Sequence, residues 1–221
     1  MKIVAINGSP RKKGNTATLL VKALEGAASK GAETKLVHLY DLTYKGCISC
    51  FSCKLKGGVS YGKCAYRDEL SPLLEEIQNA DALLLGSPIY FDEVTGSMRS
   101  FLERLLFPVH TYTTEIRTLA KKPVSIGYIY TMNETKERMV ELEYPKILKF
   151  VEDYLVKFYG SCETLGVYDT YQFPDYAKYV NTRFDGKEKA RTRDEQFPLD
   201  CEKAYALGTR LIQKAALSTC W

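Results

Sequence analysis

The stretch that decides the fold is residues 3–16, which read IVAINGSPRKKGNT. Residues 3–7 form a short apolar run typical of a buried strand, and apolar side chains then recur at helical spacing after Thr16. A strand, a glycine-bearing loop and a helix in this order gather free backbone N–H groups and the positive helix end around one point. The sequence therefore predicts a phosphate monoester site in this loop. The residues expected to hold it are Ser9, Arg11, Gly14, Asn15 and Thr16.

Two familiar phosphate loops differ from this one. A P-loop needs a lysine directly after its second glycine, whereas Gly14 is followed by Asn15 and Thr16. The dinucleotide fingerprint Gly-x-Gly-x-x-Gly is also absent. The remaining alternative is a polar turn that only precedes a helix. Ser, Gly, Asn and Thr gathered directly after a strand favour the anion site over that alternative.

Short apolar runs alternate with amphipathic stretches along the rest of the chain, which is typical of a β-α-β protein with a parallel sheet. Strands are expected at 3–7, 35–39, 82–86, 124–130 and 161–167. Helices are expected after Thr16, after Ser71 as a cap with Pro72 in the first turn, behind Thr95 as a cap, from Pro145 to Gly160, and over 204–215. We expect a single domain over 1–221, with a cysteine-bearing loop at 40–70 and an extension at 168–198.

Composition limits the class of protein. The chain has 221 residues with 31 Lys and Arg against 27 Asp and Glu, a net charge of +4, and 45% hydrophobic residues. This excludes wholesale disorder, and the charge is too small to indicate a nucleic-acid or membrane partner. No apolar run approaches the roughly 20 residues that cross a bilayer, and we expect no signal peptide because the apolar stretch at residues 1–7 is too short. We therefore expect a cytoplasmic protein with reduced cysteines.

The extension at 168–198 has no clear period. Its first half is rich in tyrosine and its second half mixes charges. One interpretation is a segment wrapped over the fold. The other is a subunit interface or a lid over the active site, because tyrosine is enriched in such surfaces.

Two motifs carry a resemblance to a known family. The first is GSP at 8–10 with GNT at 14–16, and the second is GSPIYF at 86–91 with RSFLER at 99–104. Over roughly residues 1–166 the chain resembles the NADPH-dependent FMN reductase family. The resemblance implies a flavodoxin-like α/β fold, a doubly wound five-stranded parallel sheet of order 2-1-3-4-5, with the Tyr-rich extension before the last helix. In that order both motifs lie where the strand order reverses, the usual ligand site of open sheets.

The resemblance also assigns roles. The phosphate loop would hold FMN, and the stiff turn at 87–91 would lie against its ring, framed by Pro88, Ile89, Tyr90 and Phe91. Thr131 and Met132 follow the fourth strand and form a third expected contact by fold position. No residue is predicted to be catalytic, because a flavin carries the reactivity and the protein supplies binding and orientation.

The function implied is an FMN-dependent NAD(P)H oxidoreductase. A hydride would pass from NAD(P)H to the flavin, and electrons would pass on to a small-molecule acceptor or a redox protein. Family resemblance further implies a homodimer or higher homo-oligomer. The first alternative is a flavodoxin-like or iron–sulfur flavoprotein electron carrier that does not oxidise NAD(P)H, and the positive charge of Arg11, Lys12 and Lys13 weighs against a flavodoxin. The second is a regulator that binds another phosphorylated ligand.

A cluster of four cysteines is the second informative feature. Cys47, Cys50 and Cys53 lie three residues apart, which lets three thiolates turn toward a common centre, and Cys64 follows. The motif resembles that of the iron–sulfur flavoproteins, which hold a [4Fe–4S] cluster beside FMN, although the last spacer is longer here. Zinc, redox-active thiols and a reduced loop without metal remain open. The scattered Cys162, Cys201 and Cys220 are expected to be packing residues.

Overall fold

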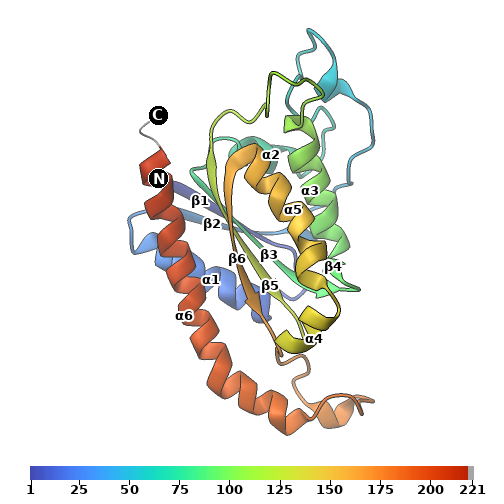
Figure 1. Cartoon of the computed structure of the whole chain (residues 1–221), viewed down its shortest axis with the longest axis vertical. Helices are drawn as coiled ribbons and strands as arrows, with labels where there is room; N and C mark the ends of the chain where they lie inside the picture. Colours follow the sequence, from blue (N-terminus) through green and yellow to red (C-terminus); the bar gives the residue numbers. More distant parts are fainter. Residues whose placement is uncertain (219–221) are drawn as a thin grey trace.

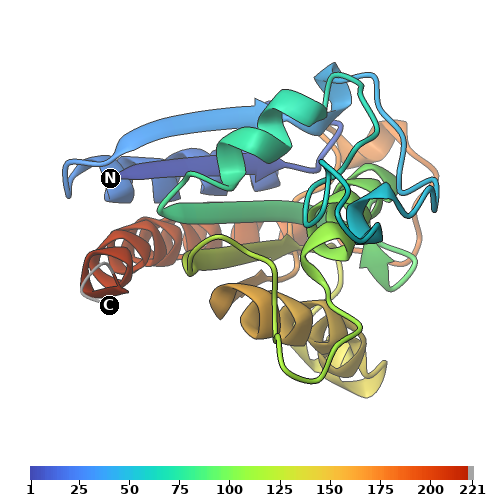
Figure 2. The ribbon, with the colours of Figure 1, turned by 90° about the horizontal axis from the view of Figure 1, so that it is seen from above.

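Strand β1 (Lys2–Asn7) lies near the middle of a parallel sheet in the computed structural model, which describes residues 1–218. It pairs with β2 (Glu33–His38) on one side and β3 (Ala82–Tyr90) on the other, and β5 (Val124–Thr131) and β6 (Gly160–Val167) follow β3. The order β2-β1-β3-β5-β6 makes five parallel strands that run side by side in the same direction (Figure 2). The predicted flavodoxin-like fold is therefore confirmed. A sixth strand, β4 (Glu93–Val94), was not expected and pairs antiparallel with the end of β3.

Helices cover both faces of the sheet. In Figure 1, α1 (Asn15–Ala28) and α6 (Gly186–Ser218) lie on one side, and α3 (Gly96–Val109) and α5 (Tyr144–Tyr159) lie on the other. The short helices α2 (Ser71–Ile77) and α4 (Lys136–Glu141) complete the covered face on the α3 side. Alternation along β1 divides the core, because Ile3 and Ala5 pack against α1 and α6 while Val4 and Ile6 pack toward α2 and α3.

Two helix ends match the local sequence. Thr95 precedes α3 as expected, and its hydroxyl accepts a hydrogen bond from the Met98 N–H at 3.2 Å. Gly160 ends α5 at a φ of 96°, a conformation that favours glycine. Ser71, in contrast, is not the cap of α2. That position is Leu70, and the Ser71 hydroxyl instead donates to the Tyr66 carbonyl at 3.0 Å.

The last helix is much longer than its apolar pattern indicates. It was expected at 204–215, but α6 has 33 residues and includes the charged second half of the extension. This part has no continuous apolar stripe. Surface charges pair along it, as Arg191 does with Glu188 at 3.0 Å, and the buried Lys189 and Phe197 attach it to the rest of the fold. Cys220 lies outside the described residues. Within residues 1–218, no helix combines the length and apolarity that crossing a membrane requires.

Helices α1 and α6 approach so closely that only glycine fits at two positions. A Cβ at Gly26 would lie 2.0 Å from the Tyr205 carbonyl oxygen, and one at Gly208 would lie 1.7 Å from that of Ala23. Both are backbone atoms, which cannot move aside without separating the helices. This contact holds the C-terminal part of α6 in a fixed position against the first helix.

We predict that Gly208→Ala lowers the free energy of unfolding by about 1–3 kcal/mol, measured by urea titration. Overpacking of this kind outweighs the gain of up to about 1 kcal/mol that alanine brings to a helix. Gly96→Ala is the control, because a Cβ at the start of α3 meets no atom within 4 Å. Equal effects of the two substitutions would contradict the close contact.

Candidate functional site

A cavity of about 800 Å³ opens at the carboxyl ends of β1, β3 and β5. Ten of the eleven residues predicted to contact a cofactor line it. These are Ser9, Arg11, Gly14, Asn15, Thr16, Pro88, Ile89, Tyr90, Thr131 and Met132. The volume lies within the range of ligand pockets, and its position is the point where the strand order reverses. The structure thus brings together three chain segments that are more than 40 residues apart in the sequence.

Hydrogen bonds hold the loop after β1 in one shape. The Gly8 N–H donates to the Gly86 carbonyl at 2.8 Å, and the Thr95 hydroxyl donates to the Gly8 carbonyl at 2.7 Å. The Ser9 N–H donates to Asn7 Oδ1 at 3.0 Å, and the Arg11 N–H donates to the Ser9 hydroxyl at 3.1 Å. The loop is therefore pinned to the end of β1, to the middle of β3 and to the residue that caps α3.

Helix α1 begins at this loop without a capping side chain. Its cap is Gly14, which provides no side-chain acceptor, and its first turn contains no acidic residue. The backbone N–H groups at a helix start need acceptors, and the helix dipole favours negative charge there. This end of the cavity is accordingly suited to an anion. Thr16 links it to the third segment through a 2.8 Å hydrogen bond with the hydroxyl of Thr131.

The segment 87–91 is a strand for most of its length and not the turn expected from the sequence. Residues 87–90 continue β3, and β4 folds back against them through a turn at Phe91 and Asp92, whose φ angles are 50° and 69°. Ser87 is buried and stabilises the hairpin base, since its hydroxyl accepts from the Thr95 N–H at 3.1 Å. Phe91 lies at the turn, is fully exposed and does not line the cavity.

The extension forms one wall of the cavity. The sequence did not predict which of its residues line the cavity. The added lining residues are Thr170, Tyr171, Gln172, Phe173, Pro174, Ala190, Arg193 and Asp194. Arg11 donates to the Gln172 carbonyl at 2.6 Å, and Asn15 donates to that of Tyr171 at 3.0 Å. Tyrosine enrichment was the one signal of this role, and it left a wrapped segment, a subunit interface and a lid as alternatives.

A buried lysine anchors this wall. Only 4% of the Lys189 side chain is exposed, and its ammonium donates to the Asn133 carbonyl and to the Asp169 carboxylate, both at 2.5 Å. The Thr192 hydroxyl donates to the same carboxylate at 2.9 Å. These contacts join the start of α6 to the loops after β5 and β6, so the extension cannot shift without uncovering a charge.

The four clustered cysteines, Cys47, Cys50, Cys53 and Cys64, line a second and much smaller cavity of about 20 Å³ beside α3. Their donor chemistry suits an iron–sulfur cluster, and all four line the same small cavity. Among the described residues, however, no three His, Cys, Asp or Glu side chains are close enough to hold a metal ion. The cavity has room for little more than a water molecule, so the segment must open to accept a cluster.

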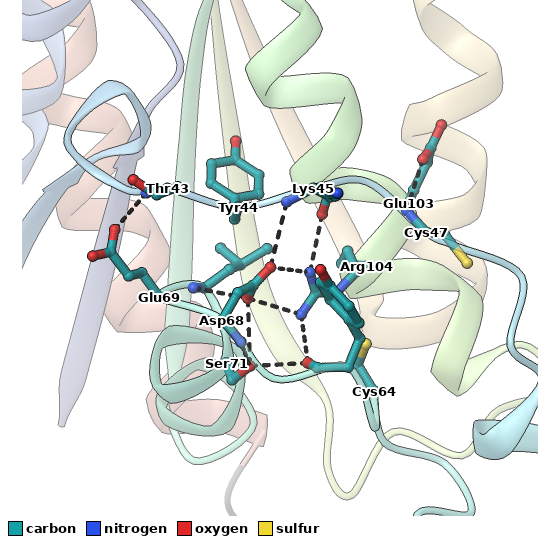
Figure 3. Close-up of polar contacts among 12 residues, drawn as sticks. Thr43, Tyr44, Lys45, Cys47, Cys64, Asp68, Glu69, Ser71, Glu103 and Arg104 are labelled. Atoms are coloured by element: carbon teal, nitrogen blue, oxygen red, sulfur yellow. Dashed lines mark hydrogen bonds and ion pairs between the residues drawn. The ribbon is translucent and has the colours of Figure 1, made fainter.

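Arg104 lies between the two ends of the cysteine-bearing loop (Figure 3). Its side chain is 1% exposed and binds the Asp68 carboxylate through two nitrogens at 2.8 and 3.1 Å. It also donates to the carbonyls of Lys45 and Tyr66 at 2.9 Å and to the Cys64 sulfur at 2.9 Å. One guanidinium therefore joins both ends of the loop that carries the cysteines.

Two further contacts attach the segment to α3. The Glu103 carboxylate accepts from the Cys47 N–H at 3.1 Å, as Figure 3 shows. Lys54 donates to carbonyls at the C-terminal end of α3, including that of Pro108 at 3.0 Å, a favourable place for a cation. Burial lowers the pKa of Lys54. In Figure 1 this segment lies at the opposite end of α3 from the extension.

Comparison with known proteins gives the following likenesses. The family model of the NADPH-dependent FMN reductases matches residues 1–142. An iron-sulfur flavoprotein of Methanocaldococcus jannaschii is 38% identical over 104 residues, which cover 47% of this chain and 51% of that protein. One from Archaeoglobus fulgidus is 40% identical over 104 residues, covering 47% and 48%. The chain spans about half the length of the curated relatives it matches.

Solved structures share the fold. An NAD(P)H:quinone oxidoreductase from Methanothermobacter marburgensis superimposes with a TM-score of 0.71 at 13% identity, covering 96% of this chain and 98% of that one. An azoreductase from Bacillus anthracis gives 0.65 at 15% identity, covering 95% and 99%. At these identities the likeness concerns the arrangement of strands and helices.

We predict that Arg104→Gln lowers the free energy of unfolding at pH 7 by about 3–5 kcal/mol, because it leaves the largely buried Asp68 carboxylate unpaired. Arg67→Gln is the control. Arg67 pairs with Glu75 at 2.5 Å, but both side chains are more than half exposed, so its loss should change stability by less than about 1 kcal/mol. Urea titration of both variants measures the difference.

The effect of Arg104→Gln should depend on pH. Burial raises the pKa of Asp68, but hydrogen bonds from Arg104 and from the Lys45 N–H outweigh burial and hold that pKa below its ordinary value. The pair therefore contributes fully above the unfolded-state pKa of about 3.9 and loses its contribution as pH falls further. A gap between wild type and variant that stays constant from pH 7 to 3 would contradict this account.

Proposed function

Because this chain belongs to the NADPH-dependent FMN reductase family, we propose that it binds FMN in the 800 Å³ cavity and acts as an FMN-dependent NAD(P)H oxidoreductase. The observation that carries the proposal is the uncapped start of α1 at the end of β1, inside that cavity. A helix start with free N–H groups and no acidic neighbour is suited to a phosphate monoester. Bound FMN would supply the chemistry that accepts a hydride and passes electrons onward.

The phosphate end of the cavity rests on the loop after β1. Ser9, Gly14 and Thr16 lie where backbone and hydroxyl donors converge, and Arg11 adds a positive charge. Arg11 uses one N–H for the Gln172 carbonyl, which leaves other donors of its guanidinium for a phosphate oxygen. We propose that this loop orients the cofactor through its phosphate.

The part of the cavity proposed to hold the flavin ring is formed by the ends of β3 and β5. Pro88 and Ile89 present a stiff, apolar wall at the end of β3, and Met132 adds a buried apolar contact after β5. Tyr90 lines the same cavity and is half-exposed, so it is available to cover one face of a flat ring. These residues would exclude water from one side of the ring and leave the open side to NAD(P)H and to a small-molecule or protein acceptor.

The cysteines support a second part of the proposal. We infer that Cys47, Cys50, Cys53 and Cys64 are the ligands of a [4Fe–4S] cluster, because four thiols line one cavity and matched relatives are named iron-sulfur flavoproteins. The six cysteines among residues 1–218 are all free thiols, which supports a reducing, cytoplasmic setting. A homodimer or higher homo-oligomer remains a prediction from the family resemblance.

The test of FMN binding uses two substitutions at one position. We expect Gly14→Asp to bind FMN at least tenfold more weakly than Gly14→Asn, measured by quenching of flavin fluorescence. Both side chains have the same size and both cap α1, but only aspartate places a negative charge beside the phosphate. Their apo forms should be similarly stable, which removes folding as an explanation.

Assays of the wild-type protein distinguish a reductase from an electron carrier. Turnover of NAD(P)H with a quinone or free flavin as acceptor, by protein loaded with FMN, is the result expected of a reductase. FMN binding without NAD(P)H oxidation would identify an electron carrier instead. A wild type that binds no FMN would overturn the proposal.

The test of the cysteine site is chemical analysis of protein prepared without oxygen. We expect about four iron and four sulfide per chain, and less than half of that in Cys53→Ser. Cys201→Ser is the matched control, since Cys201 lies on α6, packs against the core on the α1 side of the sheet and does not line the cysteine cavity. Iron-free wild type that still binds FMN would remove the cluster and leave the reductase.

A further inference from the structure

Arg193 extends the anion site from a part of the chain far outside the phosphate loop. It lies in the second turn of α6, 178 residues after Asn15, yet both residues line the same cavity. The Arg193 guanidinium donates to Asn15 Oδ1 at 3.2 Å. Asn15 in turn donates to the Tyr171 carbonyl at 3.0 Å. The side-chain amide of Asn15 therefore links the start of α1 to two parts of the extension.

The guanidinium is held but not neutralised. It lies over the ring of Phe197, 4.9 Å from the ring centre, and Phe197 itself is buried. Within residues 1–218, no carboxylate forms an ion pair with Arg193. Arg191, two residues earlier on the same helix, does form ion pairs. It pairs with Glu188 at 3.0 Å and with Glu195 at 4.0 Å.

The charges around the start of α1 are unbalanced. Arg11, Lys13 and Arg193 line the cavity, and the one acidic residue among the lining residues is Asp194. Lys12 is not part of this set, since it pairs with Asp41. A positively charged, water-accessible pocket that also contains free helix N–H groups is suited to a group with two negative charges.

We propose that Arg193 is a phosphate-recognition residue of the cofactor site, which makes the extension part of that site and the protein selective for FMN over riboflavin. The inference rests on the proposed function. The family match ends at residue 142, so Arg193 belongs to a region that the match does not cover. Arg193 reaches the phosphate end only because Lys189 and Phe197 fix the first turns of α6.

Arginine suits this task better than lysine. Its planar guanidinium offers two parallel N–H donors to a phosphate, and it keeps further donors for Asn15 while doing so. The donor set for the phosphate would then come from both ends of the chain. Riboflavin, which lacks the phosphate, would gain nothing from Arg193.

The experiment compares FMN and riboflavin as ligands of the full-length protein. Dissociation constants are measured by flavin fluorescence for wild type, Arg193→Gln, Arg193→Lys and the control Arg191→Gln. We expect Arg193→Gln to weaken FMN binding about tenfold and to leave riboflavin binding unchanged. Arg193→Lys should fall between wild type and Arg193→Gln, and Arg191→Gln should match wild type for both ligands.

Each outcome has a distinct meaning. Equal weakening of both flavins by Arg193→Gln would indicate a structural role for the side chain and overturn the inference. Unchanged FMN affinity in that variant, or an equal loss in Arg191→Gln, would also overturn it, because the contact would then be absent or only a long-range charge effect. If wild type binds neither flavin, the proposed function itself fails.

Discussion

The hydroxyl of Thr95 is the contact on which the arrangement of the site depends. It accepts from Met98 at the start of α3 and donates to the carbonyl of Gly8, whose N–H binds the Gly86 carbonyl in the middle of β3. Gly8 can take part only because it has no side chain, since a Cβ there would lie 2.9 Å from Met98. The Thr95 hydroxyl and the backbone bond between Gly8 and Gly86 thus fix the loop after β1, the middle of β3 and the first turn of α3 relative to one another. The cavity between these elements is preformed, which reduces the ordering that a ligand must impose.

Local sequence patterns were sufficient to predict the sheet and the loop at 8–16 that lines the cavity. All five parallel strands and the loop at 8–16 follow from apolar runs and glycine positions, because these signals depend on residues close together in the chain. The β3–β4 hairpin was missed, since its turn uses Phe91 and Asp92 at positive φ without a glycine. The first half of α6 was missed because it has no continuous apolar stripe: its surface charges pair with one another, and the residue buried at its start is a lysine.

Buried charges explain the other features of the structure that the sequence analysis did not predict. Arg104 and Lys189 are almost fully buried, yet in a sequence each is read as a surface residue. Their partners Asp68 and Asp169 lie 36 and 20 residues away, a separation that no periodicity reveals. Each of these pairs holds a segment without regular structure against the sheet or α3, one beside the cysteines and the other beside the larger cavity. Irregular segments have few apolar contacts of their own, so a buried ion pair takes over that role.

The close packing of α6 on α1 connects the cavity to the far end of the chain. The helix is about 50 Å long at 1.5 Å per residue, and Gly208 holds its later turns against α1 while Arg193 borders the cavity in its early turns. A ligand that binds only the folded protein stabilises it in proportion to the logarithm of its concentration. Occupancy would therefore slow backbone hydrogen exchange along α6, and the C-terminal helix would report whether the pocket is filled.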